Sequence, residues 1–273
     1  MKVGFLTGLA AAILGILSAA ALLAPWILPG DPLAMVGRPL LLPFEDWVRP
    51  LGTDRLGRDV LAALVHGARV SLSVALAAAL AATVVGSIIG TLAGYAGGWV
   101  DIVLMRLADA FRTVPNFVLA LALVSVIGPS LSSFVLAIGL TAWTGPARLV
   151  RAEVLSLKAR DFVDACRVLG MPGWQIALRE VLPNAVGPAI ALGAVTVASA
   201  ILVETALSFL GLGDPNRASW GQMIAEGRSV LRSNWYLSAI PGLAVVAAAL
   251  SVNILADALS DWLAPRRAEG AAE

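Results

Sequence analysis

Side chains that could carry out chemistry are few in this chain and lie far apart. The single histidine, His66, and the single cysteine, Cys166, are 100 residues apart. A Cys–His nucleophile or a zinc site needs such groups within bonding reach of one another. Neither GxxxxGK[ST], which cradles phosphates, nor HExxH, which binds zinc, occurs. We therefore expect no catalytic residue and no metal site, and one cysteine allows no intramolecular disulfide.

Two acidic residues within apolar stretches are the remaining candidates. Glu204 stands in AILVETALSFLGLG, and Asp109 lies between Arg106 and Arg112. A charge at bilayer depth is costly and usually faces a helix-bundle interior or a wet cavity. Each acid could line a transport pathway. Alternatively, Glu204 makes a structural hydrogen bond to a neighbouring helix, and Asp109 forms intrahelical ion pairs at three-residue spacing. Without catalysis in the chain, ions moving through these carboxylates or ATP hydrolysis by a partner would have to energise transport.

The composition places these residues in an integral membrane protein. Of the 273 residues, 59% are hydrophobic and only 14% are charged, and the mean hydropathy is +0.87. Soluble domains carry far more charge. We expect an all-α fold with six transmembrane helices. The apolar stretches that are long enough to span a bilayer lie near 3–28, 70–97, 104–127, 131–150, 185–212 and 237–259.

The first stretch predicts an uncleaved membrane anchor. Residues 3–28 contain no charge, and a run of this length exceeds the hydrophobic region of a signal peptide. The chain then divides into the anchor helix and an external loop over 1–69, a transmembrane domain over 70–267, and a tail over 268–273.

A charged island between two apolar runs, residues 151–183, is the most informative segment. Gly170 stands where a left-handed helix cap is favoured, and Pro172 forbids simple continuation. The spacing predicts a second short helix over 174–182, ended by Pro183. The first short helix is predicted to be amphipathic, with Phe162, Ala165, Cys166 and Leu169 on one face and Arg160, Asp161, Asp164 and Arg167 on the other.

Lys and Arg residues are almost evenly divided between the two sides of the membrane. The basic residues on the side of the membrane that holds the amino terminus concentrate in the island. Those on the opposite side are interleaved with Asp and Glu. We therefore expect the island to be cytosolic. The regions 29–69 and 211–236 would then face outside, either as simple linkers or as a vestibule or docking surface for a soluble partner.

Three glycines share one stripe of the second span. Gly86, Gly90 and Gly94 recur every four residues, and small residues at this spacing allow helices to approach closely. We expect tight helix packing here, within the subunit or against a second one.

The island resembles the EAA loop of ABC importer permeases. Asp164-Ala165-Cys166, then Gly170, then Leu182-Pro183 match its Glu-Ala-Ala, Gly and Leu-Pro, with Asp for Glu and Cys for the second Ala. Further matching blocks are LGTDRLGRD at 51–59, GARVSL at 67–72, GYAGGWVD at 94–101, ARLVRAEVLSLK at 147–158, ETALSFLGLG at 204–213 and SWGQMIAEGR at 219–228. Together they are similar to the C-type permease subunit of dipeptide, oligopeptide and nickel importers.

The resemblance implies a type I importer permease fold whose cytosolic coupling helix docks on an ATPase. The docking residues would be Asp164, Ala165, Cys166, Gly170, Leu182 and Pro183. It further implies a second homologous permease, two ATPases that bind ATP and Mg, and an extracytoplasmic solute-binding protein, all at the cytoplasmic membrane of a prokaryote. No cofactor would bind this chain itself, and no nucleic acid partner is expected.

One competing class remains. An ion-driven secondary transporter could bind its coupling ion at Glu204 or Asp109, but no internal inverted repeat is recognisable. An intramembrane hydrolase is disfavoured by the shortage of His and Cys. The resemblance implies import of a di- or oligopeptide by alternating access, with nickel or another small solute as the alternative, and the residues do not identify the solute further.

Overall fold

The computed structural model describes residues 2–263, and the regular elements in that range are all helices. The predicted tail, 268–273, and the last residues of the predicted permease domain lie outside this range. Four helices are long and apolar enough to span a membrane, over Gly4–Ile27, Val60–Ala96, Gly173–Leu212 and Tyr236–Leu263. They correspond to α1 (Lys2–Ile27), α2 (Val60–Ala96), α9 (Leu182–Leu207) with the short turns flanking it, and α11 (Tyr236–Leu263).

Two further spans are broken helix pairs. Helices α3 (Gly98–Thr113) and α4 (Asn116–Ile127) meet at 85°, and α5 (Leu131–Ala142) and α6 (Thr144–Lys158) meet at 41°. Counting each pair as one span gives the six that were predicted. The first break follows from Pro115, because Val114 before it is held in an extended conformation with φ −102° and ψ 132°. The span predicted near 104–127 is therefore present, but it begins earlier, at Gly98, and is broken at residues 114 and 115.

Helix α2 begins ten residues earlier than predicted. Asp59 caps its amino terminus, because its carboxylate accepts hydrogen bonds from the backbone N–H groups of Leu61 at 2.8 Å and Ala62 at 3.4 Å. His66 therefore lies in α2, where its Nε2 is 3.0 Å from the carbonyl of Leu28. The histidine tethers the end of α1 to α2, and this contact gives it a structural role.

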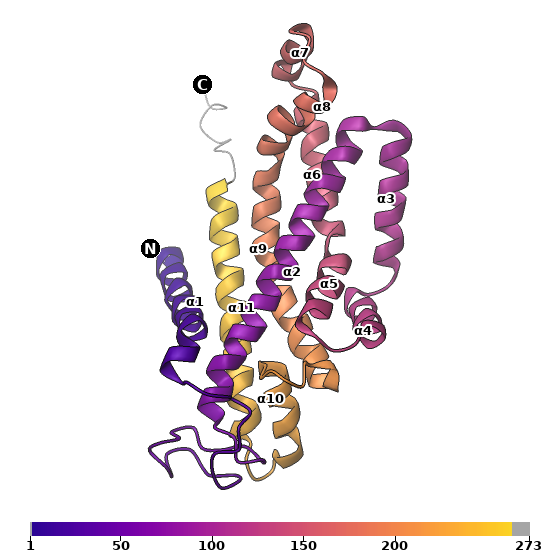
Figure 1. The fold of residues 1–273 in the computed structure, drawn as a ribbon. Helices are drawn as coiled ribbons and strands as arrows, with labels where there is room; N and C mark the ends of the chain where they lie inside the picture. Colours follow the sequence, from indigo (N-terminus) through magenta and orange to yellow (C-terminus); the bar gives the residue numbers. More distant parts are fainter. Residues whose placement is uncertain (1, 264–273) are drawn as a thin grey trace.

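The helices form an elongated bundle with two distinct ends (Figure 1). Helix α7 (Asp161–Val168) projects at one end, which we call the α7 end, and α10 (Trp220–Gly227) lies at the other, the α10 end. The main core consists largely of alanine and valine from α2, α5, α9 and α11, including Ala75, Ala78, Ala137, Ala200 and Ala248. Such small side chains permit close helix approach.

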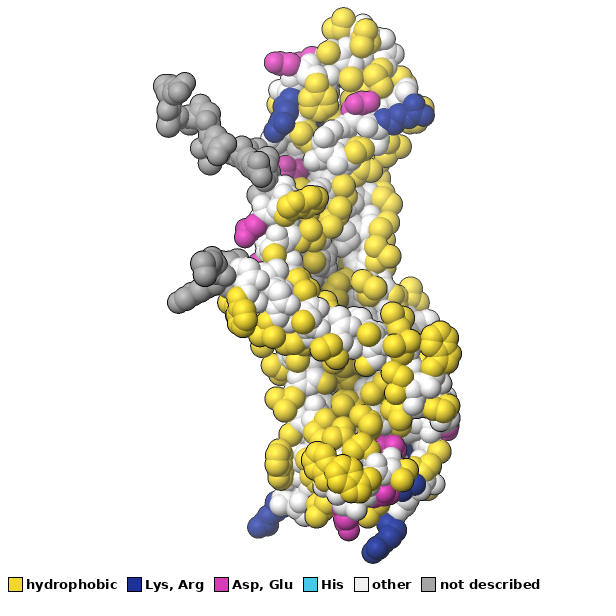
Figure 2. All heavy atoms as spheres, turned by 90° about the vertical axis from the view of Figure 1, so that its left-hand side faces the viewer, with side chains coloured by type: hydrophobic (Ala, Val, Ile, Leu, Met, Phe, Trp, Pro, Cys, Tyr) yellow, Lys and Arg dark blue, Asp and Glu magenta, His cyan; other side chains and the backbone are white. Residues whose placement is uncertain are grey.

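The outer surface between the ends is largely apolar. Figure 2 shows Lys and Arg side chains gathered toward the two ends, with hydrophobic side chains over the middle. Large apolar residues on the long helices are exposed there, among them Leu22, Leu80, Leu202 and Leu250. This distribution fits a lipid-facing belt bounded by two polar ends.

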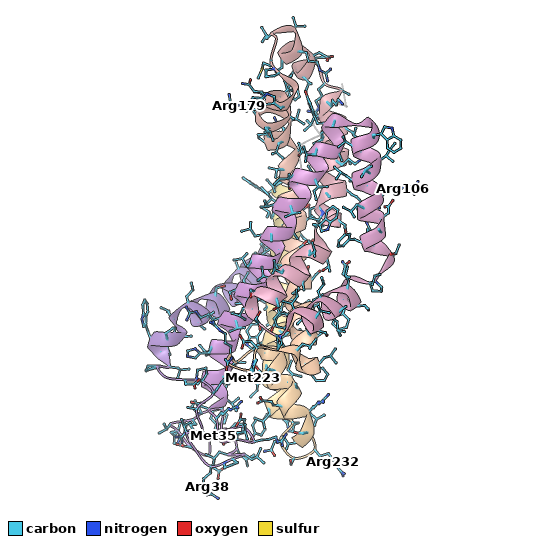
Figure 3. The ribbon with its side chains drawn as sticks, turned by 45° about the vertical axis from the view of Figure 1, so that its right-hand side comes forward. Met35, Arg38, Arg106, Arg179, Met223 and Arg232 are labelled. Atoms are coloured by element: carbon cyan, nitrogen blue, oxygen red, sulfur yellow. The ribbon has the colours of Figure 1, made fainter. Side chains whose placement is uncertain are left out.

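The α10 end brings together the two polar regions that the sequence separates. Met35 and Arg38 from the first region lie at the same end as Met223 and Arg232 from the second (Figure 3). Arg58 forms an ion pair with Glu226, with 3.3 Å between Nη1 and Oε1. Trp220 anchors α10, since it is fully buried and its Nε1 donates to the carbonyl of Leu64 at 3.0 Å.

Candidate functional site

The candidate site is the segment that forms the α7 end. Helix α6 is followed by α7, which is joined to α8 (Gly173–Gln175), to the π-helical turn η1 (Ile176–Val181) and then to α9. Unlike the spans, α7 is short and carries a charge in most turns. Its fold can be traced to two features, a glycine cap and a small core of its own.

Gly170 terminates α7 in the predicted left-handed conformation, with φ +79°. Its N–H donates to the carbonyl of Arg167 at 3.0 Å, and the N–H of Met171 reaches back to the carbonyl of Cys166 at 3.1 Å. This pair of bonds is a Schellman cap, which satisfies carbonyls that the helix end leaves open. The prediction of a cap at Gly170 is confirmed. The cap turns the chain sharply and fixes how α7 leaves the bundle.

A small cluster holds α7 against the rest of the chain. Val163 is fully buried, together with Val154 and Leu157 of α6 and Ile176 and Val181 of η1. Phe162, Cys166 and Met171 pack partly against this cluster. Val163 was not predicted to be buried, although 162, 163 and 166 form one helical stripe that could have indicated it.

The predicted apolar face of α7 was partly wrong. Phe162 and Cys166 face the cluster, but Ala165 is exposed and Leu169 is 81% exposed. The face of α7 that contains Val163 packs against the cluster, and Ala165 and Leu169 therefore point outward. On the polar side, Asp164 and Arg167 form an exposed ion pair at 2.6 Å.

The tip of the segment therefore presents large apolar side chains without a cover in the described part of the chain. Val168 is 87% exposed and adjoins Leu169, and Trp174 is 65% exposed on the following turn. A patch of this kind, beside charged residues and beyond the lipid-facing belt, is typical of a protein–protein contact. Val168 and Trp174 were missed as contact residues because periodicity assigns apolar side chains to a core by default.

Pro183 does not end the second short helix, contrary to the prediction. The chain passes from η1 into α9 without a break, and Pro183 occupies the first turn of α9. Proline is tolerated there because its missing N–H is not needed. The side chain of Asn184 also donates to the carbonyl of Glu180 at 2.6 Å. Leu182 lies apart from α7, lining an apolar hollow of about 530 Å³ between η1 and the end of α2.

The three predicted packing glycines lie against α6. A Cβ at Gly86 would be 2.6 Å from the carbonyl oxygen of Trp143, and one at Gly90 would be 2.3 Å from that of Ala147. A Cβ at Gly94 would be 2.8 Å from Cγ1 of Val154. Helices α2 and α6 thus touch backbone to backbone, within this subunit.

Polar contacts at the end of α6 extend this close packing. Lys158 donates to the carbonyl of Tyr95 in α2 at 2.6 Å, and Arg151 binds Asp101 in α3. Because α6 runs almost directly into α7, these contacts tie the segment that carries α7 to α2 and α3.

The two acidic residues inside the spans both have structural partners. Asp109 pairs with Arg148 of α6, so the predicted pairing within its own helix with Arg106 and Arg112 was wrong. The partner lies 39 residues away in sequence, where spacing rules cannot find it. Glu204 is fully buried, and the hydroxyl of Ser208 donates to its Oε1 at 2.8 Å, while its Oε2 has no hydrogen-bond partner among residues 2–263.

Comparison with known proteins identifies the family. Residues 86–269 match the family model described as "Binding-protein-dependent transport system inner membrane component". The chain is 36% identical over 253 residues to the "Di/tripeptide transport system permease protein DppC" of Pseudomonas aeruginosa, covering 90% of this chain and 83% of that protein. A Brucella suis protein, provisionally named a peptide transport system permease, is 38% identical with the same coverage.

These matches decide between an importer subunit and an ion-driven carrier. The family model covers more than half of the chain, and the relatives match nearly all of it. The resemblance seen in the EAA-like segment thus extends over about 90% of the chain. The chain belongs to the family of binding-protein-dependent transport system inner membrane components, and it is a multi-pass permease subunit of an ABC importer in the cytoplasmic membrane.

Proposed function

We propose that this chain imports short peptides, as one of two homologous permease subunits between which the solute passes. The relatives named for peptide and di/tripeptide transport carry the substrate proposal. Nickel is the second candidate, and the absence of any group of three or more His, Cys, Asp or Glu side chains able to hold a metal within 2–263 gives it no support.

The α7 end is proposed to be cytosolic and to dock on an ATPase. The exposed Val168, Leu169 and Trp174 supply an apolar contact, and the exposed Asp164–Arg167 pair supplies charge beside it. We assign the docking surface to these residues together with Ala165, Cys166 and the Gly170 cap. Leu182 and Pro183 lie farther along the chain, in the first turn of α9. They would hold η1, and with it the docking surface, on the helix bundle.

Energy would come from the partners. Two ATPases would bind ATP and Mg, close on ATP and open after hydrolysis, and α7 would convey that movement through α6 to α2 and α3. This chain would need no cofactor and no catalytic residue of its own. The α10 end, whose surface is formed by 28–59 and α10, would receive the extracytoplasmic solute-binding protein.

The substrate is tested with the complete importer in proteoliposomes. We expect ATP-dependent uptake of a labelled dipeptide and no competition from Ni²⁺. Nickel uptake without peptide uptake would refute the peptide assignment.

Coupling is tested in the same vesicles with Gly170→Pro. Proline cannot adopt φ +79° and lacks the N–H that bonds Arg167, so uptake should be lost while membrane insertion remains. Gly173→Pro is the matched control, because Gly173 begins α8 and proline is tolerated at a first helical position. Full uptake by the Gly170→Pro variant would contradict the assignment of α7 as the coupling helix. Asp164→Arg, which removes the exposed ion pair, should also lose the ATPases.

A further inference from the structure

A cavity of about 450 Å³ lies where both broken spans meet the middle of α9. The residues that define its chemistry are Arg112 and Asn116 at the α3–α4 break, Thr144 and Gly145 at the α5–α6 bend, and Thr196 and Ser199 of α9. Its volume falls within the range of small-molecule sites, roughly 300–1,000 Å³. This cavity is separate from the docking surface at the α7 end.

The position of the cavity within the spans indicates that it is wet. Residues 114 and 115 have non-helical backbone between α3 and α4, which together are long and apolar enough for one span. Backbone of this kind is tolerated at membrane depth only where it is buried in protein or lines a water-filled space. Thr196 and Ser199 lie near the middle of α9, far from both of its ends. Solutes crossing the membrane must pass this level.

The polar groups at the cavity favour an anion. The guanidinium of Arg112 has no ion pair or hydrogen bond to any described residue, whereas the neighbouring Arg148 and Arg151 are paired with Asp109 and Asp101. No carboxylate is among the residues that line the cavity. Its walls therefore hold one uncompensated positive charge.

Two further features point to a ligand. Thr144 is only 4% exposed, yet it lines the cavity and its hydroxyl has no hydrogen-bond partner in the described chain. The hydroxyl oxygen itself is not among the fully buried atoms, so it can hydrogen-bond to a solvent molecule or a ligand in the cavity. Helix α4 begins at Asn116 with no side-chain cap on its first turn. The positive end of its dipole and its free N–H groups are thus available to an anion.

We propose that this cavity is the mid-membrane binding site of the importer and that Arg112 binds the free α-carboxylate of the peptide. This inference rests on the proposed function. Thr144 and the first turn of α4 would donate to the same carboxylate. Thr196 and Ser199, whose hydroxyls donate to carbonyls of their own helix, would accept from peptide N–H groups. A broken helix that turns its amino terminus toward a substrate carboxylate is an established physical solution for transport through a bilayer.

The first test compares dipeptide uptake by the complete importer carrying Arg112→Gln, Arg112→Lys or Arg106→Gln. Arg106 is the control, because it is exposed on the outer side of the same helix and does not line the cavity (Figure 3). We expect Arg112→Gln to raise the KM for the dipeptide by about ten-fold, the effect of one lost charge-assisted hydrogen bond. Arg112→Lys should restore part of the loss, and Arg106→Gln should match the wild type. An unchanged KM in Arg112→Gln would overturn the proposal.

The second test does not depend on transport. Ser199→Cys is introduced together with Cys166→Ser, and labelling of position 199 by a sulfonate-bearing thiol reagent is compared with labelling by a neutral one. Adding Arg112→Gln should lower the rate of labelling by the anionic reagent several-fold relative to the rate with the neutral one, whereas adding Arg106→Gln should leave this ratio unchanged. Equal effects on both reagents would show a structural role and overturn the proposal. If wild-type vesicles take up no peptide, the proposed function fails, while the labelling ratio still decides whether Arg112 attracts anions to the cavity.

Discussion

Arg151 of α6 and Asp101 of α3 form a two-point ion pair, with Nε 2.5 Å from Oδ1 and Nη2 2.6 Å from Oδ2. The parallel bonds match the planar guanidinium to the carboxylate, which makes the pair geometrically specific. It joins the start of the first broken span to the second one, less than three turns before α6 gives way to α7. In the proposed coupling, movement at the docking surface would reach α3 through this pair.

Arg151→Gln should weaken both coupling and stability. One charged hydrogen-bond pair is lost, so the expected destabilisation is roughly 1.5 kcal/mol, at the low end for charged partners because the site is partly exposed. Thermal unfolding in detergent measures the stability, and the ratio of solute moved to ATP hydrolysed measures the coupling. Arg179→Gln, at an exposed arginine beyond this contact (Figure 3), is the control. An unchanged ratio in Arg151→Gln would show that the pair does not transmit movement.

Gly90→Ala should destabilise the protein. The added methyl would lie 2.3 Å from the carbonyl oxygen of Ala147, which is backbone and cannot rotate away. Overpacking of this kind costs about 1–3 kcal/mol, and it should lower the midpoint of thermal unfolding. Gly187→Ala is the matched control, because nothing lies within 4 Å of the added Cβ and alanine favours helix. Equal midpoints for the two variants would contradict the close α2–α6 packing.

Glu204→Gln should retain transport, because a glutamine oxygen can still accept the hydrogen bond from Ser208. Glu204→Leu should lower the yield of folded protein, since it removes the acceptor in a fully buried position. Uptake and size-exclusion profiles of both variants provide the measurement. An ion-driven carrier would need the carboxylate itself, so complete loss of uptake in a well-folded Glu204→Gln protein would contradict a structural role for Glu204.

Glu226 should make the stability of the α10 end depend on pH. Burial raises the pKa of this carboxyl above its ordinary value of 4.5, although Arg58 opposes the shift. The native protein then keeps the proton to a higher pH than the unfolded chain, which deprotonates near 4.5. The free energy of unfolding therefore falls as the pH rises above 4.5 and levels off once the native carboxyl is ionised.

Glu226→Gln should remove this fall from the profile of thermal midpoint against pH between about pH 4 and pH 7. Glu45→Gln, at an exposed glutamate of the same end, provides the comparison. A wild-type profile as flat as that of Glu226→Gln would show that burial does not govern this group.

The sequence revealed the membrane class, the spans and the charged island, because hydropathy and helix caps are local properties. Gly170 was recognised from its position after a helical stripe, and its left-handed φ confirms the cap. The bends near Val114 and Trp143 were not foreseen, although Pro115 is a local signal for the first of them. The partner of Asp109 depends on which helices pack together, and that information is tertiary. For the same reason the position of Arg112 at a cavity could not be predicted, because the residues around it come from three separate spans.

The central claim, that the α7 tip docks on an ATPase, is tested most directly by co-purification from the native membrane in mild detergent, read by mass spectrometry. Wild-type protein is compared with Val168→Asp and with Val48→Asp, a similarly exposed valine at the α10 end. We expect a homologous permease and P-loop ATPases with the wild type and with Val48→Asp, and loss of the ATPases alone from Val168→Asp. Retention of the ATPases by Val168→Asp, or recovery of this chain without partners in every sample, would contradict the claim.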